Sequence, residues 1–303
     1  MSEHYPRIRI HTEHGHLLMR EGLSINFYMR RSHVEVSRAV VRSLEAYLRA
    51  VGPGAIGRYV DADGNHQELD DAGWELIRNK LLNRTTALVR LRDALNCQYR
   101  YRFDYYGRPL EGSPWGDRPG VVCAVSFWLP TEYLEEHGPG RVHELALELA
   151  DPLPISSGHA GLSFNGETEP LSMSGDARKL CFRYPGMDIP NLEHLSWELG
   201  TRARGACWLT FLGQPVLGEL GGVAGLRSRL SSPGTLVQEM EGDRAVVSLG
   251  RWPEAGDTEQ GQMLPAYREL ARVLEPCLYQ EEQVLEPGLA GQERRRWERR
   301  FLD

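Results

Sequence analysis

The sequence predicts an α+β protein with mixed, largely antiparallel sheets, in which repeated strand–helix units pack helices on the sheets. One observation behind this prediction is that three apolar or alternating runs lead directly into a helical pattern. Another is that further strand-like runs follow one another without an intervening helix, as antiparallel strands do. With 41% hydrophobic and 25% charged residues over 303 positions, the chain has the composition of a globular protein with a sizeable core.

The first strand–helix unit is the clearest. Residues 23–29 alternate between apolar and polar types, which is typical of a strand with one buried face. Ser32 and Glu35 have the spacing of a capping box, which satisfies free backbone N–H groups at the start of a helix. An apolar stripe at helical spacing follows, at Val36, Val40, Leu44, Tyr47, Leu48 and Val51. We expect the helix to end at Gly52, which is followed by a proline.

Two later units repeat this order. Residues 121–129 form an apolar run, Thr131 caps the following helix, and the Gly-Pro-Gly sequence at 138–140 should interrupt that helix. Residues 206–212 form the third strand, and a helix follows Pro215. The other predicted strands are residues 98–106, 159–164, 236–240 and 245–249, and the other predicted helices are residues 70–81 and 264–278.

We expect a single domain over residues 1–303. Its three strand–helix units share a pattern but no residues, so internal duplication is a hypothesis about their origin. Residues 287–303 are basic, and we expect them to form a C-terminal helix or tail that Trp297 and Phe301 dock on the body.

The charge and the cysteines limit the class of partner and the compartment. A formal net charge of −7 gives no general affinity for nucleic acid or anionic membranes, so neither is expected as a direct partner. The first residues are polar and lack the apolar core of a signal peptide, which predicts a cytoplasmic protein. Five widely spaced cysteines without a C-x-x-C pair favour free thiols in a reducing compartment.

No motif predicts a cofactor or a metal. The histidine-rich segment 11–16 falls in a predicted turn and lacks further ligands nearby, whereas a structural zinc site needs four. Asp61 and Asp63 resemble the opening of a calcium loop, but the later glycine and glutamate that such a loop needs are absent. We therefore expect Asp63 and Gly64 to form the turn of a β-hairpin.

No motif predicts a catalytic group either. Ser157 and His159 are the nearest approach to a nucleophile and a base, and a hydrolase that uses His159 is the alternative they leave open. The serine lacks the Gly-x-Ser-x-Gly setting of a nucleophile elbow. The glycine-rich residues 218–225 lack the spacing of a phosphate-binding loop.

Acidic residues cluster in two places, within residues 61–75 and within residues 254–286. Such clusters are usually a solvated face of the fold. The functional interpretation is an anionic surface that binds a basic partner, such as the groove of a nuclease. The candidate partner-binding residues are Asp61, Asp63, Glu68, Asp71, Trp74, Glu75, Glu281, Glu282 and Glu286.

Six segments carry a family resemblance, namely residues 138–146, 157–164, 183–190, 199–202, 208–215 and 297–301. Together they resemble the bacterial type VI secretion immunity family, the TsiV-like proteins. The resemblance implies an antidote that binds a cognate cytosol-acting toxin, a type VI secretion nuclease effector, and inhibits it by occluding its active site. It brings no catalytic residues with it, so we expect the chain to be no enzyme. We also expect no cofactor, and a monomer or a weak dimer. An immunity protein for a non-nuclease cytosolic toxin is the alternative.

Overall fold

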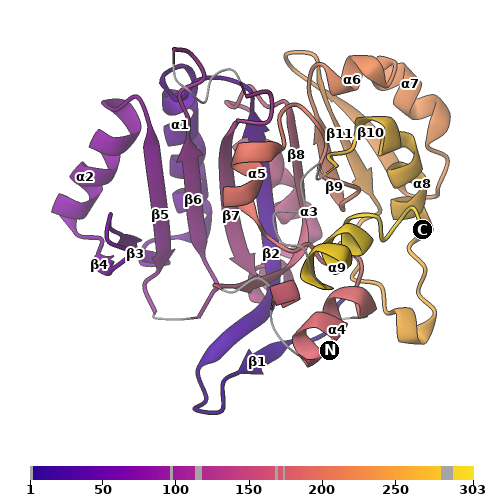
Figure 1. Cartoon of the computed structure of the whole chain (residues 1–303), viewed down its shortest axis with the longest axis horizontal. Helices are drawn as coiled ribbons and strands as arrows, with labels where there is room; N and C mark the ends of the chain where they lie inside the picture. The colour runs from indigo at the N-terminus through magenta and orange to yellow at the C-terminus, as the bar shows by residue number, and fades with distance from the viewer. Residues whose placement is uncertain (1–2, 96–97, 113–117, 168–169, 173–174, 281–288) are drawn as a thin grey trace. The chain divides into compact units, whose positions relative to one another are not determined.

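The computed structural model describes residues 3–95, 98–112, 118–167, 170–172, 175–280 and 289–303. As predicted, the fold is α+β, with nine α-helices and eleven mostly antiparallel strands in these residues (Figure 1). The chain divides into two compact units, which comprise residues 1–24, 157–190 and 202–303, and residues 25–156 and 191–201. The boundary after residue 24 falls inside β2 (Leu17–Met29). One domain over residues 1–303 stays a prediction.

The second unit contains a sheet in the order β2, β7, β6, β5, β3, β4, to which β2 contributes its C-terminal part. The other strands are β3 (Ile56–Val60), β4 (His66–Glu68), β5 (Ala87–Asp93), β6 (Arg102–Gly107) and β7 (Cys123–Pro130). The helices of this unit are α1 (His33–Val51), α2 (Asp71–Leu82), α3 (Thr131–Ala150) and α5 (Leu192–Glu198).

Helices α1, α2 and α3 pack on one face of this sheet, and α5 packs on the other (Figure 1). The register places Tyr59, Leu91, Phe103 and Phe127 opposite one another on the face that α1 and α2 cover. Phe127 lies 5.4 Å from Phe103 and 5.3 Å from Tyr47 of α1, measured between ring centres. Buried aromatic groups at these distances supply much of the hydrophobic stabilisation of a core.

The predicted capping box and the predicted helix interruption in this unit are confirmed, whereas the predicted cap at Thr131 is wrong, because Thr131 is the first residue of α3 and Pro130 holds the cap position. The carboxylate of Glu35 accepts a 2.8 Å hydrogen bond from the backbone N–H of Ser32, as in a capping box, and α1 ends at Gly52 with φ of 82°. Within α3, Gly138 has φ of 77° and a non-helical conformation, so the helix is interrupted where the Gly-Pro-Gly sequence predicts it. Glycine tolerates this positive φ because it has no Cβ.

The first unit contains a sheet in the order β10, β11, β9, β8, β2, with β1 paired to β2. Its remaining strands are β1 (Arg9–His11), β8 (Ser157–Gly166), β9 (Leu209–Leu212), β10 (Thr235–Met240) and β11 (Arg244–Leu249). Its helices are α4 (Asp176–Arg183), α6 (Val216–Glu219), α7 (Gly222–Arg229), α8 (Pro265–Leu274) and α9 (Leu289–Glu298).

Further local features differ from what the sequence predicts. The helix expected after Pro215 is divided into α6 and α7 at Gly221, which has φ of 78°. The strand expected over residues 98–106 begins only at Arg102, because residues 98–101 form the connection from β5. The strand β5 itself was not predicted, although it lies inside the sheet between β3 and β6.

Candidate functional site

Most carboxylates of residues 61–75 are exposed, on the β3–β4 hairpin and the first turns of α2. Asp63, Glu68, Asp71 and Glu75 all face solvent. This stretch contains no lysine or arginine, so no basic residue of its own neutralises it. The group is therefore a local concentration of negative charge on the second unit.

Two other carboxylates of this stretch have structural roles. Asp61 Oδ1 accepts hydrogen bonds from the backbone N–H groups of Asp63 at 3.0 Å and Asn65 at 2.8 Å, and its Oδ2 accepts one from Gln67 at 2.8 Å. The bond from Gln67, followed by that from Asn65, lowers the pKa of Asp61. Asp70 caps α2, because its side chain accepts from Gly73 N–H at 2.8 Å. Asp61 thus shapes the hairpin turn that presents Asp63.

Trp74 is half-buried in an apolar groove of about 180 Å³ between α1 and α2. The groove is also lined by Val41, Leu44, Glu45, Leu48, Ile77, Arg78 and Leu81. Trp74 is partly exposed and directly precedes Glu75 in the chain. It therefore packs α1 and α2 together and also borders the acidic surface.

The second acidic region gives less support to a binding surface. Glu281, Glu282 and Glu286 lie outside the described residues. Several preceding carboxylates have partners within the fold: Glu254 with His4, Asp257 with Arg183, Glu269 with Ser231 and Ser232, and Glu275 with Arg299. These residues stabilise the first unit.

A set of arginines that the sequence analysis did not single out lies on the sheet face that carries α5. The register places Arg58 of β3 opposite Arg92 of β5, and Arg92 opposite Arg102 of β6. Arg90 lies two residues before Arg92 and therefore on the same face. We call Arg58, Arg90, Arg92 and Arg102 the arginine face.

One buried carboxylate, Asp104, lies within the arginine face. Its two oxygens are each 2.6 Å from a guanidinium nitrogen, one of Arg92 and one of Arg102. Burial alone would raise the pKa of Asp104, but the charges of Arg102 and Arg92 outweigh it and hold the pKa below its usual value. Arg58 and Arg90 are half-buried, and their side chains have no hydrogen bond or ion pair within the described part of the chain.

A pocket of about 420 Å³ adjoins the arginine face at the ends of β5 and β6. Leu88 and Tyr106, which are opposite each other in these strands, line it together with residues of α5. The guanidinium carbon of Arg108 lies 3.6 Å from the ring centre of Trp197, and burial lowers the pKa of Arg108. The Tyr106 hydroxyl donates a 3.2 Å hydrogen bond to Glu193. Aromatic side chains thus line the pocket together with one positive group, Arg108, and one negative group, Glu193.

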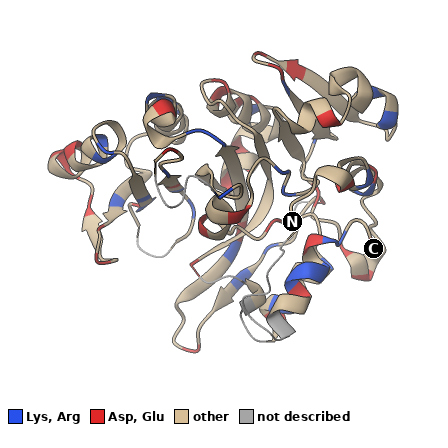
Figure 2. Cartoon of the chain, turned by 45° about the horizontal axis from the view of Figure 1, so that its top comes forward, with Lys and Arg blue, Asp and Glu red and all other residues tan. Residues whose placement is uncertain are grey.

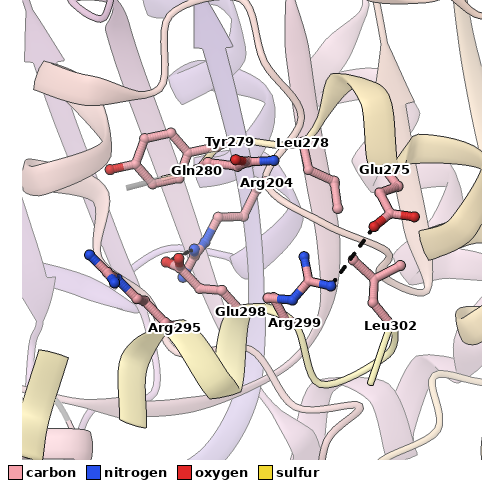
Figure 3. Close-up of a pocket in the computed structure, with 9 residues that line it drawn as sticks. All are labelled: Arg204, Glu275, Leu278, Tyr279, Gln280, Arg295, Glu298, Arg299 and Leu302. Atoms are coloured by element: carbon pink, nitrogen blue, oxygen red, sulfur yellow. Dashed lines mark hydrogen bonds and ion pairs between the residues drawn. The ribbon is translucent and has the colours of Figure 1, made fainter. Parts of the chain in front are cut away.

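Another pocket, of about 330 Å³, lies in the first unit beside α9 (Figure 3). Arg204 is paired with Glu298 at 2.6 Å, and Arg299 lies 3.8 Å from Glu275. These two ion pairs balance each other, and Arg295, which also lines the pocket, adds one positive charge.

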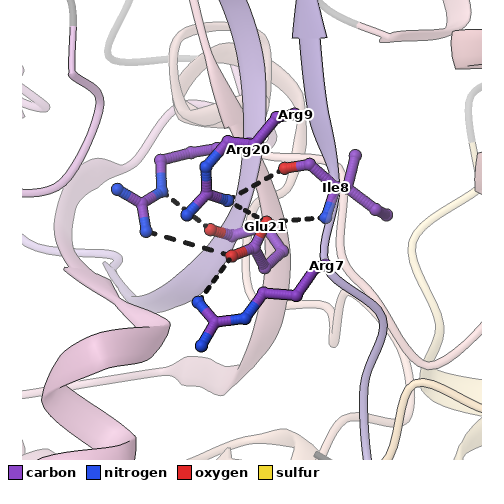
Figure 4. A network of polar contacts seen from close by, with 5 residues as sticks. All are labelled: Arg7, Ile8, Arg9, Arg20 and Glu21. Carbon is purple, nitrogen blue, oxygen red and sulfur yellow. Dashed lines mark hydrogen bonds and ion pairs between the residues drawn. The ribbon is translucent and has the colours of Figure 1, made fainter. Parts of the chain in front are cut away.

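Glu21 is a buried carboxylate that ties the N-terminal segment to β2 (Figure 4). It accepts a 2.8 Å hydrogen bond from Ile8 N–H and contacts Arg9, while Arg7 and Arg20 lie 3.8 and 3.9 Å away. A buried charge costs several kcal/mol unless it is paired and hydrogen-bonded, as here. We therefore assign this cluster a structural role, in which it stabilises the fold.

The residues considered for hydrolysis are in the core of the first unit. His159 is 2% exposed, and its Nε2 lies 3.1 Å from Asp188. The Ser157 hydroxyl donates to the carbonyl oxygen of Arg202 at 2.8 Å. Neither side chain reaches a surface where a substrate could meet it, so these residues give the hydrolase alternative no support.

Two further kinds of feature, a metal-binding cluster and a membrane-spanning helix, do not occur in the described residues. They contain no group of three or more His, Cys, Asp and Glu side chains that could hold a metal ion. Among the helices they form, none has the length and apolar character needed to cross a bilayer.

The chain is similar to a known protein family and to a solved structure. A family model described as type VI immunity for VRR-NUC, TsiV, matches residues 39–301. The solved structure of the Pseudomonas aeruginosa T6SS protein PA0821 is similar, with a TM-score of 0.79 and 20% sequence identity, over 97% of this chain and 87% of that chain. At this identity the similarity concerns the fold. No curated protein matches the chain.

Proposed function

This chain belongs to the TsiV family of type VI immunity proteins for VRR-NUC, and from that premise we propose that it stops its nuclease by binding over the catalytic groove. Its function is immunity, and its target is a VRR-NUC nuclease effector. Occlusion needs affinity and shape from the immunity protein, but no catalytic group. Because the nuclease must be stopped where it meets nucleic acid, we also propose that the chain acts in the cytoplasm.

The observation that carries this binding mode is the exposed acidic surface of residues 61–75. A groove that binds phosphates is lined by basic groups, so exposed carboxylates complement it and speed the encounter. We propose that Asp63, Asp71 and Glu75 contribute most of this charge, with Trp74 as an anchor beside them. The proposed contact set also includes Asp61, Glu68, Glu281, Glu282 and Glu286.

The test uses the cognate VRR-NUC effector of this chain. Asp63→Arg, Asp71→Arg and Glu75→Arg together should slow association roughly tenfold at low ionic strength, because the reversed charges repel a basic groove. Stopped-flow association rates across a salt series measure this effect, and thermal unfolding confirms that the variant is folded. The effect should diminish as salt screens the charges.

A matched control reverses three exposed carboxylates on α3, with Glu135→Arg, Glu136→Arg and Glu144→Arg. The total change in charge is identical, so a long-range effect of net charge alone would slow both variants equally. A larger loss for the variant of residues 63, 71 and 75 supports the proposed surface. Equal rates for the two variants would contradict it.

A further inference from the structure

We infer that the arginine face is a second contact surface for the nuclease and binds the carboxylates that hold its catalytic metal ions. The pocket beside the arginine face would accept an anchoring side chain from the same partner. This inference rests on the proposed function, in which the chain binds the nuclease directly. It adds a positively charged contact surface to the acidic one.

The first argument is an excess of positive charge within the sheet. Like charges in directly opposed positions of neighbouring strands destabilise a sheet, and two such pairs occur here, Arg58 with Arg92 and Arg92 with Arg102. Asp104 binds two of these guanidinium groups, and Glu68 is opposite Arg58. Among the described residues of these strand rows, two carboxylates face four arginines, so the rows themselves carry two more positive than negative charges. An anionic partner would relieve that repulsion.

The second argument is that the cations are partly desolvated before any partner binds. Arg58 and Arg90 are half-buried, and a charge pair formed by half-buried groups is stronger than one formed in open water. Arg92 is 8% exposed and is held by Asp104, which keeps the centre of the arginine face rigid. A preorganised surface loses less entropy when it binds.

The third argument is the pocket that continues the arginine face along β5 and β6. Leu88, which is 46% exposed, lies two residues from Arg90 in β5. Its partner Tyr106 lies two residues from Asp104 in β6, so all four are on one face of the sheet. Trp197 and Arg108 form the far wall. Tryptophan, tyrosine and arginine are the residues most enriched at the energetic centres of protein interfaces.

Neighbouring charges favour a protein partner over nucleic acid. Glu68 ends the row that contains Arg58, and the β3–β4 hairpin, which also carries Asp61 and Asp63, forms this edge of the sheet (Figure 2). A long polyanion across the arginine face would meet that negative border. A nuclease centre presents metal-binding carboxylates next to a basic phosphate-binding groove, so its two charges match the two surfaces.

The experiment compares two double charge reversals in the full-length protein. Arg58→Glu with Arg90→Glu changes the arginine face, and Arg38→Glu with Arg42→Glu changes exposed arginines of α1 as a control. Dissociation constants for the purified nuclease are measured in EDTA and in saturating Mg²⁺. In EDTA, reversal on the arginine face should weaken binding by at least roughly tenfold, and the control should stay near wild type. Mg²⁺ should weaken wild-type binding more than binding of the Arg58/Arg90 variant, because the metal occupies the same carboxylates.

Each other outcome is decisive. A folded Arg58/Arg90 variant with wild-type affinity would overturn this inference and leave direct inhibition in place. Failure of the wild-type protein to bind the nuclease would overturn the proposed function as well. A short DNA duplex that binds wild type and not the Arg58/Arg90 variant would assign the arginine face to nucleic acid instead.

Discussion

The guanidinium group of Arg300 lies over the indole of Trp297, with its central carbon 3.6 Å from the ring centre. Its Nε also donates a 2.7 Å hydrogen bond to the carbonyl oxygen of Pro185. Burial is the main cause that lowers the pKa of Arg300 to about 10, so the group stays charged at neutral pH. The hydrogen bond to Pro185 ties the C-terminal residues to the rest of the first unit, in which Trp297 is 1% exposed.

Replacing that cation should therefore destabilise the fold. We expect Arg300→Ala to lower the free energy of unfolding by about 2–3 kcal/mol, because it removes the stacking and leaves the Pro185 carbonyl without its donor. Urea unfolding measures the loss. Arg296→Ala is the control, because Arg296 is exposed and contacts only the Phe182 ring at 5.0 Å in the described residues. Similar losses for both variants would contradict the assigned role.

Two glycines with opposite surroundings give a second prediction. A Cβ at Gly186 would overlap the carbonyl oxygen of Glu254, so Gly186→Ala should cost more than about 3 kcal/mol of stability. A Cβ at Gly140 meets no atom within 4 Å, and this glycine lies in α3. Gly140→Ala should therefore raise stability, by up to about 1 kcal/mol. Thermal unfolding of both variants tests the pair, and a stable Gly186→Ala protein would show that the loop shifts easily.

The buried His33 should account for part of the pH dependence of folding stability. It is fully buried, its Nδ1 lies 2.8 Å from the Tyr105 hydroxyl, and burial lowers its pKa. As pH falls below about 6.5, the unfolded chain binds a proton here that the folded chain does not, so stability decreases. His33→Gln should show a smaller loss of stability between about pH 7 and pH 5, measured by urea unfolding at several pH values. Parallel curves for wild type and variant would refute this.

Substitutions of Trp74 can distinguish a role in packing from a role in binding the nuclease. Trp74→Ala should lower the free energy of unfolding by about 2 kcal/mol, because losing the indole removes packing contacts between α1 and α2 and enlarges the groove that it lines. Trp74→Phe keeps most of that packing and should cost about 1 kcal/mol or less. If Trp74 also contacts the nuclease, Trp74→Phe should weaken binding more than it lowers stability. Calorimetric titration with the nuclease and thermal unfolding together decide this, and unchanged affinity would leave Trp74 a core residue.

Much of the local structure was predictable because its signals lie close together in the chain. The capping box at Ser32 and Glu35, the break at Gly138 and the cap at Asp70 depend on neighbouring residues alone. One exception is β5, which was not predicted although Ala87, Val89 and Leu91 alternate with Leu88, Arg90 and Arg92 as in a strand. A strand assignment there would have placed two arginines on one face.

By itself, the sequence determined the α+β class, the acidic stretch of residues 61–75 and the family resemblance, since each is a property of contiguous residues. Only the tertiary structure decided that Arg58, Arg92 and Arg102 form one row, because they come from three strands whose register depends on burying residues such as Leu91 and Phe103. It also decided that His159 lies in the core opposite Asp188. Strand pairing and burial join residues far apart in the chain, and no local pattern encodes which distant residue becomes the neighbour.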